Sequence, residues 1–347
     1  MKNIAVVFGR NTEFHTLFPK ESPFVKGIRY WTNMLKDELE NKGYRLISYL
    51  DMKDAEDVEA FFHFDRLRKD ILKQYSGKYH IYLGFEPAVV EPAHAPKVMS
   101  LLARYVYDAV LTLHTDISGE RIYPVRLPAD ICFIREDGRQ PEKLACLFSG
   151  DKTGFGKELY SLRRKTIRYA EKNFINEFAF FGNWGRPYSA FRCYQGYTDD
   201  KRKAAEPYKF CFCFENEYGM RGGVSEKIFE ALCIGTVPVY MGANDILEYV
   251  PRECFVDFRN FQSLEQCFRH LKSMSDEEYK RYISAIRAFM TSENTKNQYS
   301  AQHMADTFIQ ICKEKNIHKS RRLYLADMYR IVRKVYVVFC RLKRLLT

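Results

Sequence analysis

The sequence predicts an α/β protein made of two Rossmann-like domains, each a parallel sheet covered by helices on both faces. Apolar runs of strand length alternate with stretches of helical spacing along most of the chain. A polar stretch, Arg135–Glu142, interrupts the alternation and is typical of an interdomain linker. The 347 residues, of which 46% are hydrophobic, suffice for two domains of roughly 150 residues, each with its own core.

The first domain is expected over residues 1–140. Its strands are predicted at four apolar runs: Ile4–Phe8, Tyr44–Leu50, His80–Phe85 and Ala109–Leu113. Its helices are predicted at 28–39, in the polar stretch between the second and third strands, and around Val98–Tyr107. Repeated strand–helix units of this kind imply a parallel sheet.

The second domain is expected over residues 141–318 and repeats this pattern. It opens with a strand, a basic helix and a strand, at Leu144–Phe148, Leu159–Lys172 and Phe178–Gly182. A buried strand, a loop with glycines, a helix and another strand follow, at Tyr208–Phe214, 217–223, 225–234 and Val237–Met241. This second group makes a nucleotide-binding half-unit, with the ligand expected at the loop.

A lysine at the start of this helix is the first candidate site residue. Ser225 is a plausible N-cap, Gly235 stops the helix, and Lys227 lies in its first turn. The helix dipole disfavours a cation there, so the ammonium gains most if an anion also binds. Glu226 suits the dipole and is able to accept hydrogen bonds from sugar hydroxyls. The alternative is an ordinary capped helix with a solvated lysine.

The tail, residues 319–347, holds most of the net charge of +11, with nine Lys or Arg residues and one acid. Its apolar residues recur at steps of three and four: Leu325, Met328, Tyr329, Val332, Tyr336, Phe339, Leu342 and Leu346. This pattern predicts an amphipathic helix at an anionic membrane surface, too charged to span the bilayer. The alternative is a last helix packed on the body. The rest of the chain is nearly balanced in charge, which argues against nucleic acid as a partner.

The remaining composition points to a reduced, intracellular environment. Ten cysteines are scattered without a Cys-x-x-Cys motif, so neither a disulfide framework nor a zinc site is expected. The apolar run after Met1 is too short for a signal peptide. The protein is therefore expected in the cytoplasm.

Four groups of residues in the second domain resemble the signature block of family 10 glycosyltransferases, the α-1,3/1,4-fucosyltransferases that use GDP-fucose. They are Phe-Glu-Asn at 214–216, Ser-Glu-Lys at 225–227, Gly-Thr-Val-Pro-Val at 235–239, and Pro251 with Phe255 and Asp257–Phe261. One position departs from the family, which usually has an aromatic residue where this chain has Gly223. Tyr218 is the candidate to replace that contact.

The resemblance implies the GT-B architecture, in which two Rossmann-like domains face a cleft, and chemistry without a metal or other cofactor. The absence of Asp-x-Asp agrees with this expectation. It also implies a catalytic base, because Gly84-Phe85-Glu86-Pro87 resembles the acceptor-domain motif whose glutamate is thought to act as base. Glu86 follows a predicted strand at the end where open sheets bind ligands. The alternative is a surface-loop glutamate.

The same resemblance points to residues for the donor. Lys227 is the first choice for the pyrophosphate and Arg163 the second, and the alternative for Arg163 is a solvated face in a run of basic residues. Asn216 and Glu226 would hold fucose or ribose hydroxyls, and the alternative for Asn216 is a strand-end turn residue. With Ser225 and Tyr218, these residues complete the expected donor site.

The sequence thus predicts an inverting α-1,3-fucosyltransferase, or an α-1,4 one, that moves L-fucose from GDP-fucose to a glycan acceptor of GlcNAc or LacNAc type. A cytoplasmic start with a basic tail is expected of a bacterial enzyme that works peripherally at the inner face of the cytoplasmic membrane, on lipopolysaccharide O-antigen. Two alternatives remain. One is a GT-B glycosyltransferase with a different nucleotide-sugar donor, and the other is a non-catalytic, membrane-bound glycan- or nucleotide-binding module.

Overall fold

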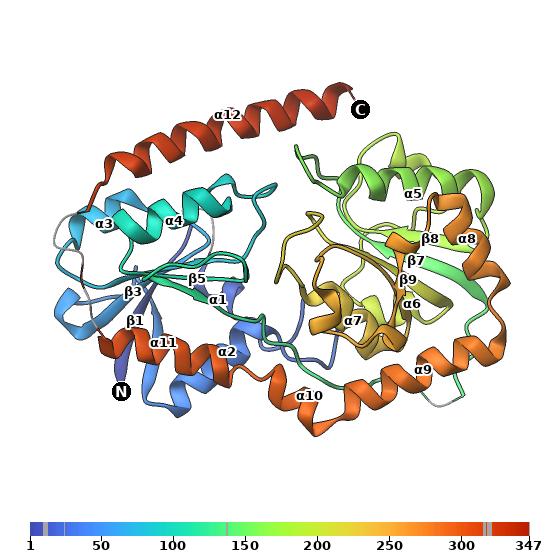
Figure 1. The fold of residues 1–347 in the computed structure, drawn as a ribbon, viewed down its shortest axis with the longest axis horizontal. Coiled ribbons are helices and arrows are strands. Elements are labelled where there is room, and N and C mark those ends of the chain that lie inside the picture. Colours follow the sequence, from blue (N-terminus) through green and yellow to red (C-terminus); the bar gives the residue numbers. More distant parts are fainter. Residues whose placement is uncertain (10–12, 24, 137, 315–316, 318–320, 347) are drawn as a thin grey trace. The chain divides into compact units, whose positions relative to one another are not determined.

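The computed structural model describes residues 1–9, 13–23, 25–136, 138–314, 317 and 321–346 (Figure 1). The chain divides into two compact units. Unit 1 comprises Met1–Lys20, Arg29–Pro128 and Ser300–Thr347, and unit 2 comprises Glu21–Ile28 and Ala129–Tyr299. Both are α/β units around a parallel sheet, which confirms the predicted fold class.

Unit 1 holds a six-stranded sheet in the order β2-β1-β3-β4-β5-β6. Its strands are β1 Lys2–Val7, β2 Tyr44–Ser48, β3 Val58–Phe64, β4 His80–Gly84, β5 Ala109–Thr112 and β6 Ile122–Pro124. Its helices are α1 Phe14–Leu17, α2 Trp31–Asn41, α3 Lys69–Gln74, α4 Pro96–Tyr105, α11 Gln302–Glu314 and α12 Tyr324–Leu346. The helices α2 and α11 lie on one side of this sheet, and α3 and α4 on the other (Figure 1).

Unit 2 holds a five-stranded sheet in the order β11-β10-β9-β7-β8. Its strands are β7 Lys143–Phe148, β8 Phe178–Phe181, β9 Tyr208–Phe214, β10 Val237–Met241 and β11 Val256–Asp257. Its helices are α5 Tyr160–Asn173, α6 Lys201–Ala205, α7 Glu226–Ile234, α8 Leu264–Ser273, α9 Asp276–Thr291 and α10 Glu293–Gln298. Short 3-10 helices lie at Ala55–Asp57, Pro92–His94, Tyr188–Ala190, Ile246–Glu248, Arg252–Cys254 and Phe258–Asn260.

One predicted helix is confirmed only in part, because the helix α3 covers Lys69–Gln74 of the predicted stretch and a strand precedes it. The stretch between the second and third predicted strands contains β3, a strand that pairs with both β1 and β4. Five of its residues are buried, from Val58 to His63 with one half-buried interruption at Glu59. The run was missed because polar residues flank it on both sides. Its apolar and polar residues alternate only weakly, because a central strand is buried on both faces of the sheet. The short strand β6 also went unpredicted.

The domain boundaries differ from the expected 1–140, 141–318 and 319–347. Residues 129–140 belong to unit 2, and Ser300–Thr347 return to unit 1. The helix α11 attaches this last segment to unit 1. Its Phe308 is fully buried, with its ring 4.8 Å from that of Phe62 in β3. Residues 21–28 lie within the predicted first domain but belong to unit 2, because Val25 is buried in the core of unit 2.

The order of strands in unit 2 creates a topological switch point. The chain runs from β7 to β8 on one side and then to β9 on the other, so the topology switches between β7 and β9. In open α/β sheets, ligands bind at the carboxyl ends of the strands at such a switch point. Here those ends carry Ser149 after β7 and Glu215 and Asn216 after β9.

The helix α12 packs on unit 1 with one face only. Leu325 and Tyr329 contact a core cluster of unit 1, so the prediction of a helix is confirmed and its packing on the body is established for this face. Seven other apolar residues of α12 are each between 49% and 61% exposed: Met328, Ile331, Val332, Val335, Val338, Phe339 and Leu342. Within the described part of the chain, no helix is both long and apolar enough to cross a membrane.

Candidate functional site

The start of α7 forms the centre of the site in unit 2. Ser225 is the N-cap in extended conformation, and its Oγ accepts a hydrogen bond from the backbone N–H of Lys227. The helix ends at Gly235, whose φ of 73° is the left-handed conformation that glycine adopts readily. Both predicted ends of this helix are therefore confirmed, and its start lies beside the carboxyl end of β9, where Glu215 accepts a hydrogen bond from the N–H of Ser225.

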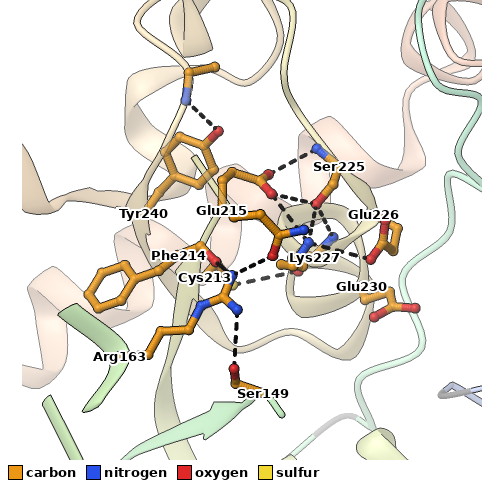
Figure 2. A network of polar contacts seen from close by, with 12 residues as sticks. Ser149, Arg163, Cys213, Phe214, Glu215, Ser225, Glu226, Lys227, Glu230 and Tyr240 are labelled. Atoms are coloured by element: carbon orange, nitrogen blue, oxygen red, sulfur yellow. Dashed lines mark hydrogen bonds and ion pairs between the residues drawn. The ribbon is translucent and has the colours of Figure 1, made fainter. Parts of the chain in front are cut away.

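A carboxylate that sequence reasoning did not single out completes this centre. Glu215 is 4% exposed and accepts hydrogen bonds from the N–H of Ser225 at 2.9 Å and from its Oγ at 2.7 Å (Figure 2). The Lys227 Nζ lies 3.3 Å from the same carboxylate and 2.9 Å from Ser225 Oγ. Glu215 directly follows an apolar strand, and a charged residue in that position is the sequence signal that indicates it.

This network changes the explanation for a lysine in the first turn of α7. The sequence alone predicted a bound anion as the balancing negative charge, whereas Glu215 supplies a negative charge within the protein. The Lys227 side chain is still 23% exposed, so a ligand is able to reach it. Lys227 is thus held in place before any ligand binds.

Glu226 lies next to this pair, with an oxygen 3.7 Å from Lys227 Nζ. Desolvation raises the pKa of Glu226, but the nearby Lys227 and Lys201 lower it by more, so its pKa lies below the ordinary value. The side chain is 34% exposed and stays ionised at neutral pH. An ionised, reachable carboxylate is a suitable acceptor for hydroxyl groups.

Arg163, from α5, lies at the switch point and is only 5% exposed. Its guanidinium donates to Ser149 Oγ at 3.2 Å and to the carbonyl of Phe214 (Figure 2). It also donates to Asn216 Oδ1 at 3.0 Å. The alternative of a solvated charge is wrong. The structure brings Arg163 and Asn216 together, and the arginine joins the carboxyl ends of β7 and β9.

The loop between β9 and α7 explains the unusual Gly223. A Cβ at this position would lie 2.8 Å from both Cγ and Sδ of Met220, which is itself 7% exposed. The loop is anchored by the N–H of Gly222, which donates to both carboxylate oxygens of Asp245 at 3.1 and 3.0 Å. Met220 thus fills the space beside the backbone that a larger residue at position 223 would need. Tyr218 is half-buried against the core of unit 2.

Glu86 lies in unit 1, directly after the buried strand β4 and Phe85, as predicted. The backbone on both sides of it is held by buried or half-buried side chains. The N–H of Phe85 donates to Asp65 Oδ1 at 2.9 Å, and the Glu86 carbonyl is hydrogen-bonded to Nδ1 of His94. Glu86 is itself half-buried.

These supporting groups have shifted pKa values because they are buried. Burial raises the pKa of Asp65 to about 6, and burial lowers the pKa of His94 to about 4. At neutral pH the imidazole is therefore neutral, with Nδ1 as the donor to Glu86 and Nε2 as the acceptor from the Tyr82 hydroxyl at 2.9 Å. Among the described residues, no three His, Cys, Asp or Glu side chains cluster as metal ligands would.

The class of the protein follows from these features together with its structural neighbours. Two crystal structures of an α1,3-fucosyltransferase, one of them determined with GDP, align with TM-scores of 0.60 over 91% of both chains, at 14% and 13% identity. Likeness at this identity shows the fold. The chain has the GT-B fold of two Rossmann-like domains.

Sequence comparison assigns part of the chain to a family. Residues 165–333 match the model described as glycosyltransferase family 10 (fucosyltransferase), C-terminal part, and this region belongs to that family. An α-(1,4)-fucosyltransferase of Arabidopsis thaliana is 34% identical over 21% of this chain, and the α-(1,3)-fucosyltransferase FucT of Helicobacter pylori is 32% identical over 21%. The matched segments span only 18% and 15% of those two relatives.

Proposed function

We propose that the protein is an inverting α-1,3-fucosyltransferase that transfers L-fucose from GDP-fucose to a GlcNAc-containing glycan. The network of Glu215, Ser225 and Lys227 at the start of α7 is the observation that carries this proposal. It lies beside the switch point of a Rossmann-like unit and inside the region that belongs to family 10. The relatives' names support fucosyl transfer, and the GDP bound to one structural neighbour supports a guanine nucleotide as donor.

In this proposal the donor lies over the N-terminus of α7. Lys227 contacts the pyrophosphate, where it shifts part of its charge interaction from Glu215 to the phosphate oxygens. Ser225 presents its hydroxyl to the same anion, and Glu226 accepts hydrogen bonds from sugar hydroxyls. The dipole of α7 adds to the binding of the diphosphate. No metal ion or other cofactor is assigned a role, so activity should survive chelation with EDTA.

Arg163, Asn216 and Tyr218 form the rest of the proposed donor site. Arg163 stabilises the pyrophosphate from its place at the switch point and orients Asn216, whose amide is offered to the sugar. Its multiple donors allow it to keep contacts with the protein while it faces the ligand. Tyr218 supplies the aromatic contact that Gly223 does not.

Glu86 is the proposed general base. Its carboxylate takes the proton from the acceptor hydroxyl as that oxygen forms a bond to C1 of fucose and the bond from C1 to the GDP oxygen breaks. The electron pair of the broken bond stays with GDP, where Lys227 and the start of α7 stabilise the developing charge. Attack on the face opposite the leaving group inverts the configuration.

We further propose a bacterial setting in which the enzyme adds fucose to lipopolysaccharide O-antigen from the cytoplasmic side of the inner membrane. The exposed apolar face of α12 is accompanied by exposed Arg330, Lys334 and Arg341. Apolar and basic residues together on one helix suit peripheral binding to an anionic bilayer. Co-sedimentation with vesicles that contain anionic lipid, compared with neutral vesicles, tests this placement.

The central test uses Glu86→Gln, which keeps the size of the side chain and removes the base. Turnover of GDP-fucose with β-galactosyl and GlcNAc acceptors should fall by about a hundredfold or more, the scale of general-base catalysis. The affinity for GDP, measured by calorimetry, should stay the same because Glu86 lies in the other unit. Retained turnover would contradict the role of Glu86, and no transfer by the unmodified enzyme on any acceptor would contradict the function.

A glycosyltransferase with a different donor is the second candidate, and Gly223 favours it because this position departs from the family pattern. A panel of GDP-fucose, other GDP-sugars and UDP-sugars, read by binding and by slow hydrolysis, separates the two. A response to a UDP-sugar without one to GDP-fucose would favour the second candidate.

A further inference from the structure

The segment that carries Glu86 is attached to helix α12, more than two hundred residues later in the chain. Its anchor is Glu91, whose side chain is only 2% exposed. The Glu91 carboxylate accepts hydrogen bonds from the Tyr329 hydroxyl and from Arg333 Nε, the latter at 2.9 and 3.1 Å. A third partner, Arg66, reaches it from the end of β3. The sequence pattern did not single out Glu91.

A second contact lies further along the same helix. The Tyr336 hydroxyl donates to the backbone carbonyl of Val89 at 2.7 Å. Because Tyr329, Arg333 and Tyr336 are spaced by four and three residues, they share one face of α12. The pairing of Lys69 with Asp327 fixes the start of the helix to α3. Together these contacts hold the start and middle of α12 against unit 1.

The connection from Glu91 back to Glu86 is short and regular. The N–H groups of Val90 and Glu91 both donate to the Pro87 carbonyl, at 2.9 and 3.0 Å, which closes a tight turn directly after Glu86. The N–H of His94 donates to the Glu91 carbonyl at 2.8 Å, and the His94 ring is hydrogen-bonded to the Glu86 carbonyl. A displacement of Glu91 would therefore be passed to the backbone of Glu86.

We propose that α12 is a positioning element for the reaction, in which Arg333 and Tyr329 fix Glu91 and thereby hold the loop 86–94 with the Glu86 carboxylate in place for proton transfer. The catalytic part of this inference rests on the proposed function of Glu86. The physical basis is the buried charge of Glu91, which is stable in place only while its partners are present. Loss of Arg333 or Tyr329 should make the loop open toward water rather than unfold the unit, because Arg66 still pairs with Glu91.

The test compares Arg333→Gln with Lys334→Gln in the full chain. The two variants lose the same charge at adjacent positions, and Lys334 is exposed. Backbone hydrogen exchange of residues 85–94 should accelerate about tenfold or more in Arg333→Gln and stay unchanged in Lys334→Gln. The value of kcat should fall about tenfold or more with little change in the affinity for GDP, because the donor site lies in unit 2.

A rescue and a second variant separate positioning from general damage. Arg333→Lys keeps a cation near Glu91 and should recover part of kcat, and Tyr329→Phe should lower kcat in the same direction as Arg333→Gln. Unchanged exchange in 85–94 for Arg333→Gln would overturn the attachment of the loop to α12. Faster exchange with an unchanged kcat would overturn the positioning role.

The exchange experiment does not depend on catalysis, so the two proposals are distinguishable. If the unmodified enzyme transfers no fucose, the proposed function and the catalytic part of this inference both fail. Hydrogen exchange of residues 85–94 in the same samples still decides whether Arg333 and Tyr329 hold the loop.

Discussion

The ammonium of Lys227 lies 3.3 Å from the carboxylate of Glu215, so the cation at the start of α7 is balanced by the protein itself. The Glu215 side chain is 5% exposed and is committed to Ser225 by two further hydrogen bonds. This arrangement holds Lys227 in one orientation at the N-terminus of the helix. A ligand then meets a cation whose conformational entropy has already been lost.

Lys227→Met should lower the affinity for GDP about 10- to 100-fold, the usual worth of one hydrogen bond from a charged group. Isothermal calorimetry measures this directly. Lys165→Met removes a charge from an exposed position of α5 and is the matched control, for which no change is expected. Equal affinities of the Lys227→Met variant and the unmodified protein would show that the diphosphate does not contact Lys227.

Arg163→Met should destabilise the protein by about 2 to 4 kcal/mol, because the Phe214 carbonyl and Asn216 Oδ1 lose a charged donor in a buried place. The loss is read from denaturant unfolding. Lys172→Met, at an exposed position in the last turn of the same helix, should change stability by less than about 0.5 kcal/mol. If the two variants are equally stable, the hydrogen bonds of Arg163 do not hold the strand ends.

Gly223→Ala should destabilise the protein by about 1 to 3 kcal/mol, because the new Cβ would press on the buried side chain of Met220. In a Met220→Ala background the same change should cost much less, and a double-mutant cycle of unfolding free energies measures this coupling. Additive effects would contradict the steric explanation of Gly223. Gly223→Tyr should likewise be tolerated only with Met220→Ala.

The stability of unit 1 should fall as the pH drops from about 6.5 toward 4. The buried imidazoles of His80 and His94 have pKa values lowered to about 4 by burial. The unfolded chain, with an ordinary histidine pKa, binds protons first as the pH falls, so acid favours unfolding by up to about 3 kcal/mol for each histidine. Unfolding free energies at pH 7 and 4.5 should show a smaller pH dependence for His94→Gln than for the unmodified protein.

Asp65 gives the control of opposite sign. Its pKa is raised to about 6 by burial, so the folded state binds this proton more tightly than the unfolded state. Stability from this group is therefore lost as the pH rises from about 4 to 6. Asp65→Asn should gain stability relative to the unmodified protein across that interval, and a difference that is constant with pH would contradict the shift.

The parts of the fold that the sequence predicted well are those in which local pattern and tertiary burial agree. The strand Tyr208–Phe214 and the helix from Ser225 to Gly235 had apolar periodicity and clear end signals, and both appear as predicted. The strand Val58–Phe64 was missed because its neighbours are polar and its burial comes from two flanking strands. Burial of that kind is not visible in a local window of sequence.

Residues that act through distant partners were missed for the same reason. Glu215 belongs to the Phe-Glu-Asn motif, but only the structure shows that it balances Lys227. Glu91 resembled a second ordinary Glu-Pro pair, and its importance comes from Arg333 and Tyr329 in the tail. The tail pattern correctly indicated an amphipathic helix, whereas which of its faces meets the body depended on contacts far away in sequence.

The exchange of segments between the two units has a consequence for the order in which the protein is completed during synthesis. Unit 2 has all of its residues once Tyr299 has been made, although it began after most of unit 1. Unit 1 is incomplete until α11 with Phe308 has been made. The helix α12, which binds Glu91, is made after that. A chain that has emerged from the ribosome up to Tyr299 would therefore hold a complete second unit and an incomplete first one. The proposed catalytic loop would be the last part of the enzyme to be fixed.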